Sequence, residues 1–573
     1  MNRSLSQYLS PVTKVNRVFD TSSRESAGET FMGAGPRQAP APAQLRRSRT
    51  ERQVVVDMHT RVALVHDRLT PLAARELNNL EVRRALEAEG IDWFAVPGLD
   101  DTASAVGVDA RQRPQALAAL RARLSGSRGY LARPKSGMAP GDGAWEGSSD
   151  KTWERANGLS VVRAFWFRTT EEGHLTHGAD TGCDIEFWEP AESVPGQGAD
   201  RLVAPRRNRA SEYVALGHQQ LVVPGEQMTR LVGRVHGSEV PALRPTRTRP
   251  ELDIPFPDEH PFPIDVVYTW VDGDDPAWQR RRAESRGEVF HAEAASLARY
   301  VSRDELKYSL RSVRMFMPWV RNIYIVTDQQ TPHWWAPGDG RARVVDHREI
   351  FDDPSHLPTF NSHAIESRLH HIPGLSRHFV YFNDDMFIGR TLTPSAFFHP
   401  NGIAKFFPSP AQVPYGPPEP DEVPTSVAAK NNRRLIQERF GRTLVQKMKH
   451  VPYALNRDIL AAIERDFPEE HRATSASPVR SISDLSIASS LHHYYSYYSG
   501  CSLPGDLRYG YFALDDPELE HKLELLLLRR DRDTFCLNDS ASDPAEIEHQ
   551  SHLLHRFLEA FYPVPSPYEK AAA

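Results

Sequence analysis

Acidic residues gather in three short loops that could hold a metal ion beside a phosphate. The loops are residues 272–275 (DGDD), Asp328 and residues 383–385 (NDD), and each directly follows a short apolar run. Adjacent carboxylates repel, so Asp384 and Asp385 are stable together mainly where a cation or hydrogen-bond donors compensate them. Mg²⁺ or Mn²⁺, held by one or two carboxylates and by substrate phosphate oxygens, would fit such a turn. Solvated carboxylates, or a cap on the next element, would give the same pattern.

Two further patterns could do chemistry but are weak alone. Glu366 and His370 are four residues apart on a predicted helix, a spacing that brings two side chains together but more often gives a surface hydrogen bond than a catalytic pair. A basic stretch opposed only by Glu438 would form a solvated helical face or attract anionic substrates. Its cations are Lys430, Arg433, Arg434, Arg439, Arg442, Lys447 and Lys449.

The elements around these loops predict an α/β domain. Short apolar runs at 264–269, 322–327 and 378–382 are typical of buried parallel strands. Helices are predicted between them: one from a capping-box pattern at Ser302 and Glu305 to Pro318, and one from Ser362 to His371. This alternation predicts a Rossmann-like, mainly parallel, doubly wound sheet with helical additions, in which ligands bind at the carboxyl ends of the strands.

Composition shifts divide the chain into four parts. Residues 1–53, rich in Ser, Arg, Ala and Pro, are expected to be a disordered tail. Residues 54–250 are expected to form an accessory region of α/β or α+β type, with a small α/β unit to about residue 124 followed by a strand-rich segment. Prolines cluster at residues 241–263, before an expected catalytic domain at 251–562 and a C-terminal tail at 563–573.

Bulk properties exclude several classes of protein. A chain of 573 residues with 40% hydrophobic and 25% charged residues is typical of a globular protein, and a net charge of −6 gives no support for nucleic acid as a partner. Cys183, Cys501 and Cys536 match neither a disulfide framework nor a paired zinc site. Because no apolar run approaches the roughly 18 residues that span a bilayer, a cytoplasmic protein is expected, with peripheral contact at the inner face of the membrane left open.

Four stretches carry a specific resemblance, in order along the chain. They resemble the four conserved regions of the Stealth proteins, which include bacterial capsule and exopolysaccharide phosphotransferases and the catalytic subunit of the animal enzyme that builds the lysosomal mannose-phosphate tag. The resemblance covers roughly residues 264–539. The stretches are IDVVYTWVDGDDPAW, RDELKYSLRSVRMFMPWVRNIYIVTDQQTPHW, LPTFNSHAIESRLHHIPGLSRHFVYFNDDMFIG and FCLND.

The resemblance implies roles for individual residues. The expected catalytic residues are His450 in KHVPY, Arg480 in PVRS, Glu366 and Asp385. It places His450 above His370 as the candidate base. The expected metal ligands are Asp384, Asp385 and Asp539. The expected donor-binding residues are Asp272, Gly273, Arg311, Asp328 and Asn383.

The resemblance implies transfer of a hexose-1-phosphate, such as N-acetylglucosamine-1-phosphate, from a UDP-type nucleotide-sugar to a polysaccharide hydroxyl, with release of nucleoside monophosphate. His450 would remove the acceptor proton, with Glu366 as a metal ligand, an orienting partner or a rival base. Two alternatives remain: a metal-dependent glycosyltransferase that releases the nucleoside diphosphate, and a non-catalytic carbohydrate-binding protein. The sequence identifies neither the sugar nor the oligomeric state.

Overall fold

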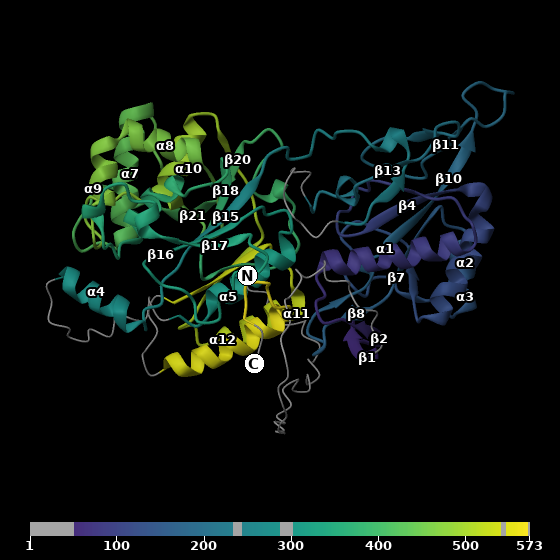
Figure 1. Ribbon diagram of the computed structural model, residues 1–573, viewed down its shortest axis with the longest axis horizontal. Helices are drawn as coiled ribbons and strands as arrows, with labels where there is room; N and C mark the ends of the chain where they lie inside the picture. Colours follow the sequence, from purple (N-terminus) through teal and green to yellow (C-terminus); the bar gives the residue numbers. More distant parts are fainter. Residues whose placement is uncertain (1–50, 233–242, 287–301, 540–545, 571–573) are drawn as a thin grey trace, which may run out of the picture. The chain divides into compact units, whose positions relative to one another are not determined.

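The computed structural model describes residues 51–232, 243–286, 302–539 and 546–570 (Figure 1). Separate sheets distinguish an N-terminal region, up to about residue 258, from a C-terminal region that begins near residue 262. Most of the expected N-terminal tail lies outside the described residues. Its last three residues, 51–53, instead begin strand β1 (Glu51–Val56), which pairs with β2 (His59–Val65).

The N-terminal region contains an eight-stranded mixed sheet. Strand β10 (Cys183–Ala191) runs parallel to β4 (Ser104–Asp109) and antiparallel to β7 (Val161–Phe165). The prediction of a small α/β unit followed by a separate strand-rich segment is therefore wrong, because β4 and β10 come one from each and form a single sheet. The helices are α1 (Pro71–Ala88), α2 (Arg113–Gly126) and α3 (Asp150–Asn157). The other strands of this sheet are β3 (Phe94–Ala95), β5 (Tyr130–Ala132), β6 (Trp145–Glu146), β11 (Arg201–Val203) and β12 (Tyr213–Ala215).

The last residues of the N-terminal region lie beyond the expected boundary at 250. Strand β14 (Thr246–Thr248) pairs with β13 (Leu221–Val223). Leu252 is fully buried and belongs to the same apolar cluster as Phe94 and Trp188. The region therefore extends past Leu252, because this side chain completes its core. Two short strands, β8 (Arg168–Thr169) and β9 (Thr176–His177), extend the β1–β2 hairpin into a four-stranded sheet.

The C-terminal region is built on a five-stranded sheet in the order β17-β16-β15-β18-β23. The three predicted strands are confirmed, and the α/β class is confirmed with them. The first four strands run parallel, whereas β23 pairs antiparallel with β18. The strands are β15 (Ile264–Thr269), β16 (Ile323–Thr327), β17 (Ala342–Asp346), β18 (His378–Asn383) and β23 (Tyr453–Asn456).

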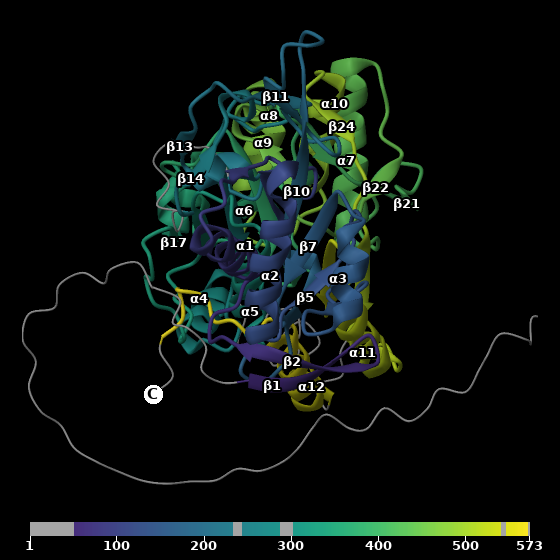
Figure 2. The same ribbon diagram turned by 90° about the vertical axis from the view of Figure 1, so that its right-hand side faces the viewer.

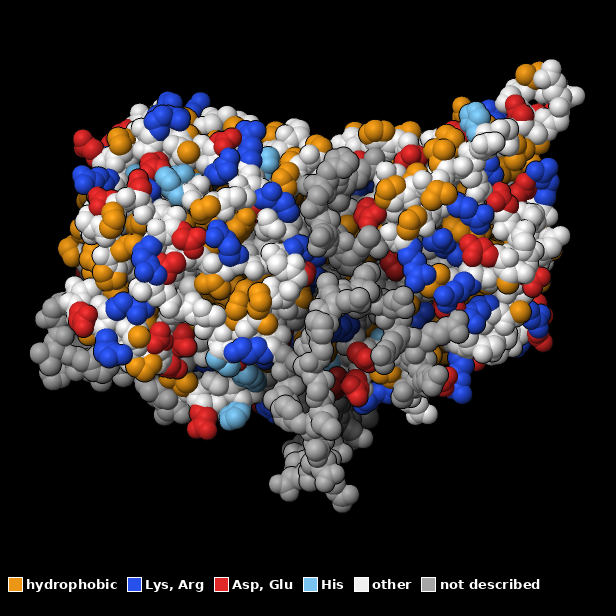
Figure 3. All heavy atoms as spheres, viewed as in Figure 1, with side chains coloured by type: hydrophobic (Ala, Val, Ile, Leu, Met, Phe, Trp, Pro, Cys, Tyr) orange, Lys and Arg blue, Asp and Glu red, His pale blue; other side chains and the backbone are white. Residues whose placement is uncertain are grey.

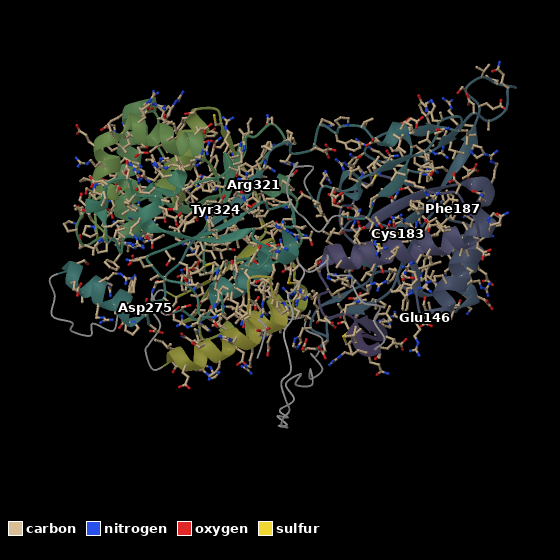
Figure 4. All side chains as sticks on the ribbon, in the orientation of Figure 1. Glu146, Cys183, Phe187, Asp275, Arg321 and Tyr324 are labelled. Carbon is tan, nitrogen blue, oxygen red and sulfur yellow. The ribbon has the colours of Figure 1, made fainter. Side chains whose placement is uncertain are left out.

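One buried carboxylate fixes the amino edge of this sheet. Asp265 accepts hydrogen bonds from the guanidinium of Arg321 at 2.8 and 2.6 Å and from the backbone amides of Asn322 and Ser376. It therefore ties the start of β15 to the segments entering β16 and β18. Figure 4 shows Arg321 and Tyr324 at this edge, well away from Asp275, which follows the carboxyl end of β15. The amino edge is thus structural, and the carboxyl edge remains available for a site.

Helices α7 to α10 gather at one end of the C-terminal region, as the two perpendicular views agree (Figure 1, Figure 2). A second, three-stranded sheet has the order β19-β26-β25. Its strands are β19 (Met386–Ile388), β25 (Tyr509–Ala513) and β26 (Thr534–Asn538). The helices are α4 (Pro276–Arg286), α5 (Glu305–Phe316), α6 (Ser362–Ser367), α7 (Pro424–Phe440), α8 (Arg457–Asp466), α9 (Pro468–Ser475), α10 (His492–Tyr498), α11 (Leu519–Arg529) and α12 (Ile547–Phe561). Short strand pairs β20 (Ala404–Phe406) with β24 (Ser502–Pro504), and β21 (Pro408–Gln412) with β22 (Gln446–Met448), complete it.

Two local predictions are wrong. The capping box at Ser302 and Glu305 does not form: helix α5 begins at Glu305, and the carboxylate of Glu305 accepts a 2.6 Å hydrogen bond from the amide of Arg303. The expected C-terminal tail is not a loose end: its residues 563–570 pack against the rest of the C-terminal region. Tyr568 in that segment is fully buried and stacks on Trp335, so it contributes apolar burial to the core.

None of the described helices is long and apolar enough to cross a membrane. Figure 3 shows blue and red side chains interspersed over the visible face, without one sign of charge dominating it.

Candidate active site

The candidate site begins where β18 ends, at the carboxyl edge of the sheet. Asp384 and Asp385 form the turn between β18 and β19. Because β23 runs antiparallel to β18, the loop that enters β23 lies beside the end of β18. That loop carries His450, whose Nε2 atom lies 3.3 Å from both carboxylate oxygens of Asp385. The reversed edge strand therefore joins residues 65 positions apart in the chain.

Strand β26 supplies the other side of Asp385. Cys536 lies opposite Met386 in the antiparallel pairing, and its Sγ donates to Asp385 Oδ2 at 3.1 Å. Asn538 Nδ2 donates to the same oxygen at 3.4 Å. Burial alone would raise the pKa of Asp385, but the charge of His450 and these hydrogen bonds outweigh it and hold the pKa below its ordinary value. The aspartate is therefore ionised at neutral pH.

His450 responds in the opposite direction. Burial alone would lower its pKa, yet the negative charge and hydrogen bond of Asp385, with a smaller contribution from Glu366, raise the pKa above its ordinary value. Its side chain keeps 28% exposure, so it can reach a molecule bound at the edge. The imidazole is thus oriented by a carboxylate that also stabilises its protonated form, an arrangement suited to accepting a proton.

Asp384 has a different environment from its neighbour. Burial, followed by the negative charges of Glu305 and Asp385, raises its pKa well above the ordinary value. Glu305, at the first position of α5, has a pKa raised to about 7, mainly by burial. Three carboxyl groups therefore gather here with incomplete compensation. Asp384 and Asp385 carry the hard oxygen donors that Mg²⁺ or Mn²⁺ prefers, and a cation held by them stays a prediction.

Glu366 and Arg480 are both associated with helix α6. Glu366 on α6 is buried, and it accepts hydrogen bonds from the hydroxyls of Tyr381 and Ser489, each at 3.3 Å. Arg480 Nη2 donates to Ser362 Oγ at 3.2 Å, at the start of the same helix. Burial raises the pKa of Glu366, whereas the positive charge of Arg480 is one of the influences that lower it. Tyr381 lies on β18, four residues before Asp385, which connects Glu366 to the edge.

The expected donor-binding loops form their own cluster. Gln330, after β16, bonds the backbone of Asp272 through both atoms of its amide, and Gly273 O accepts from Gln279. Asp328 pairs with Arg281 of α4 at 2.8 Å. Asn383 lies opposite Thr269 at the ends of β18 and β15. Asp272, Gly273, Asp328 and Asn383 thus all lie at or after the carboxyl ends of strands, and their role toward a donor stays a prediction.

Arg311 does not fit the predicted role. Its guanidinium donates to both oxygens of Glu569, to Glu559 and to the carbonyl of Tyr562, at 2.7–2.9 Å. Its side chain is only 5% exposed and four of its five N–H groups are already bonded, so it is not placed to hold a phosphate. The prediction that Arg311 binds the donor is therefore wrong, because this residue holds the C-terminal segment against α5.

Two further predicted residues have partners that change their interpretation. Asp539 forms a 2.7 Å ion pair with Arg303, so its carboxylate is compensated without a metal; its role as a ligand stays a prediction. The Glu366–His370 spacing brings no contact, because α6 ends at Ser367 and the chain continues as a tighter 3₁₀ turn. His370 bonds to Glu464 of α8 instead.

Sequence reasoning missed Glu305, Cys536 and Asn538, which act on the predicted aspartates, and Tyr381, which bonds to Glu366. Cys536 and Asn538 stand in the FCLND motif, so the motif itself was the available signal. Glu305 was assigned to a capping box, which concealed its proximity to Asp384.

Comparison with known proteins identifies the family. Models of all four Stealth conserved regions match: region 1 at residues 262–289, region 2 at 299–406, region 3 at 449–497 and region 4 at 526–573. The stretch beginning LPTFNSHAI therefore belongs to region 2 rather than region 3. Region 3 instead contains His450 and Arg480.

The similarity also covers most of the N-terminal region, which the sequence resemblance left out. Two exopolysaccharide phosphotransferases of Streptomyces coelicolor are 46% and 45% identical, over 92% and 94% of this chain and 89% and 96% of their own. The exopolysaccharide phosphotransferase CpsY of Mycobacterium tuberculosis is 33% identical over 93% of this chain and 94% of its own.

Among solved structures, the galactosyltransferase LgtC gives a TM-score of 0.27 at 11% identity, covering 53% of this chain and 97% of its own. The mouse xyloside xylosyltransferase 1 gives 0.24 at 10% identity, covering 49% and 100%. With four conserved regions in order and relatives aligned over nearly the whole length, the chain belongs to the Stealth family.

Proposed function

We propose that this chain transfers a hexose-1-phosphate, such as N-acetylglucosamine-1-phosphate, from a UDP-type nucleotide-sugar to a hydroxyl of a polysaccharide, in exopolysaccharide or capsule synthesis. The observation that carries the proposal is the contact of His450 with Asp385, beside Asp384 at the carboxyl edge of the sheet. The names of the relatives, which are exopolysaccharide phosphotransferases, support the reaction class.

The reaction needs a base beside the acceptor. The acceptor oxygen attacks the phosphorus that carries the sugar, the bond from that phosphorus to the nucleotide oxygen breaks, and nucleoside monophosphate leaves. His450 Nε2 takes the hydroxyl proton as the oxygen attacks, and Asp385 stabilises the imidazolium that forms. Glu366 is the rival base. It is buried and bonded to Tyr381 and Ser489, and it has no direct contact with His450 among the described residues, so we assign it a positioning role.

The reaction also needs compensation for the charge of two phosphates. Asp384 and Asp385, with Glu305 behind them, would hold Mg²⁺ or Mn²⁺, which would neutralise charge on the donor pyrophosphate. Arg480 is exposed, and its hydrogen bond to Ser362 leaves guanidinium donors that can reach an anionic substrate. The Asp272 and Asp328 loops are proposed to position the nucleotide.

Product analysis tests the proposal. The full chain is incubated with Mg²⁺, a panel of UDP-sugars and a polysaccharide acceptor, and the released nucleotide is identified by chromatography. Release of UMP that depends on acceptor is the expected result, with the His450→Ala variant as the inactive control. Release of UDP would instead establish a glycosyltransferase, and donor binding without release of either nucleotide would establish a binding protein.

A further inference from the structure

A cluster of nitrogen and oxygen ligands lies outside the proposed active site, at the far end of α6. His370 and His371, in the 3₁₀ turn after α6, both direct Nε2 at the same oxygen of Glu464, at 2.6 and 2.9 Å. Their ligand atoms all lie within 4.8 Å of one another. We propose that these three side chains form a binding site for a transition-metal dication, with Zn²⁺ as its natural occupant.

The geometry needs little change to take the ion. Tetrahedral Zn²⁺ with bonds of roughly 2.0–2.1 Å separates its ligand atoms by about 3.3 Å. Here Glu464 Oε2 lies 2.6 Å from His370 Nε2 and 2.9 Å from His371 Nε2, so these two separations must lengthen by about 0.7 and 0.4 Å. The Nδ1 atom of His370 makes no hydrogen bond within the described residues, so a small turn of the ring breaks no hydrogen bond on that side.

A third histidine, His471, lies beside the cluster. His471 Nε2 faces the carbonyl oxygen of Ser367 at 3.0 Å, so this nitrogen carries the proton of a neutral ring. Nδ1 then presents a lone pair, and it lies 3.7 Å from Glu464 Oε1. Arg368, which donates to the same oxygen, already supplies positive charge there. The N–H to carbonyl bond is also the usual outer partner of a metal-binding histidine.

The kinds of ligand atom point to a transition metal. Two imidazoles and one carboxylate oxygen suit Zn²⁺ rather than Mg²⁺, which prefers oxygen ligands alone.

The residues around Glu464 hold its carboxylate in place, as the outer partners of a metal ligand do. Arg368 Nη1 donates to Oε1 at 2.6 Å, which leaves Oε2 for the ion. The charge of Arg368 is balanced by Asp352, which accepts from its other terminal nitrogen at 2.5 Å. Glu464 and His371 keep 30% and 34% side-chain exposure, so an ion can enter from solvent. A bound ion would tie the end of α6, the helix that carries Glu366, to α8.

Equilibrium dialysis tests the site on the full chain, first stripped with a chelator. The protein is dialysed against Zn²⁺ in the presence of excess Mg²⁺, and bound metal is counted by mass spectrometry. We expect Zn²⁺ bound at this cluster, with affinity reduced at least about 100-fold in both His371→Ala and Glu464→Gln, since even loss of an outer-shell partner costs 10–100-fold. His399→Ala, a half-buried histidine outside the cluster, is the matched control and should bind as the wild type does.

A second measurement separates this cluster from Asp385, His450 and Cys536, whose ligand atoms also lie within 4.8 Å of one another. Co²⁺ bound at the His370 cluster has no sulfur ligand, so its visible bands should persist in Cys536→Ser and disappear in His371→Ala. On the wild-type chain, Zn²⁺ should also protect His371 from diethyl pyrocarbonate. Unchanged Zn²⁺ affinity in His371→Ala, cobalt bands that vanish only in Cys536→Ser, or unprotected His371 would each overturn the proposal.

Discussion

The substitution Asp385→Asn tests the electrostatic core of the site, because it removes one charge and keeps the shape of the side chain. His450 Nε2 lies 3.3 Å from both oxygens of Asp385, and both side chains are less than a third exposed. An opposite charge at such a distance shifts a pKa by roughly 1–3 units, or about 1.4–4 kcal/mol. The pKa of His450, which Asp385 raises, should therefore fall in the variant.

Nuclear magnetic resonance can measure this shift in metal-free protein labelled at histidine ring carbons. The His450 signal is assigned by its loss in His450→Ala, and its position is followed from pH 5 to pH 9. Asp272→Asn is the matched control, since it removes an acidic charge at the same edge of the sheet and has no contact with His450 among the described residues. A His450 pKa that is the same in Asp385→Asn and wild type would refute the pairing.

The same pair sets a pH window for stability. The folded pKa of His450 is raised, so its contribution to the free energy of unfolding is fully present below its unfolded pKa of about 6.5 and is lost as pH rises through the folded value. The pKa of Asp385 is lowered, so its contribution is present above about pH 3.9 and is lost as pH falls through the folded value. The stability difference between wild type and Asp385→Asn in urea unfolding should thus be largest between about pH 4 and pH 6.5.

Three further substitutions give separate expected outcomes. His450→Ala should lower kcat for UMP release by about 10²–10⁴-fold with little change in donor KM, the contribution of a general base; an unchanged kcat would remove His450 from the chemistry. Asp384→Asn should raise the Mg²⁺ concentration needed for half-maximal rate, yet increase the free energy of unfolding of the metal-free chain by about 1 kcal/mol, because one of three clustered carboxylates becomes neutral. Arg311→Ala should lower that free energy by about 3–5 kcal/mol in thermal or urea unfolding, since it leaves the buried Glu569 unpaired, and donor binding measured by calorimetry on the folded variant should be unchanged.

The sequence was most informative about strands and loops. Apolar runs located β15, β16 and β18 within a residue or two at each end, since buried parallel strands have continuous apolar sequence. Asp384 and Asp385 were found because they follow such a run. The carboxyl-edge rule then placed them where the structure brings His450 to them. Periodicity and spacing could not reveal His450 itself, because its position depends on the reversed direction of β23. Only the resemblance pointed to this residue.

Pairings at long range were beyond the reach of local patterns. Nothing near Arg311 in the chain indicates that Glu559 and Glu569, about 250 residues later, would occupy its guanidinium. The same holds for Glu305, whose negative charge acts on Asp384 although the two lie in different elements. The division of the N-terminal region failed for a related reason, because β4 and β10 are neighbours only through a parallel pairing across some 75 residues of chain. Neighbouring residues in the sequence determine turns and strands, whereas the order of strands in the fold determines which distant residues become partners.

The contrast between the two edges of the main sheet has a consequence for engineering. At the amino edge, Asp265 has every oxygen satisfied by Arg321, Asn322 and Ser376, so folding benefits from that charge. At the carboxyl edge, burial and neighbouring negative charge disfavour the ionised forms of Asp384 and Glu305, so these two charges lower the stability of the fold. Random libraries screened for thermal resistance alone should therefore accumulate neutral side chains at the second edge while preserving the first. Robust but inert proteins would result, and a screen for tolerance to heat would have to be coupled to a screen for turnover.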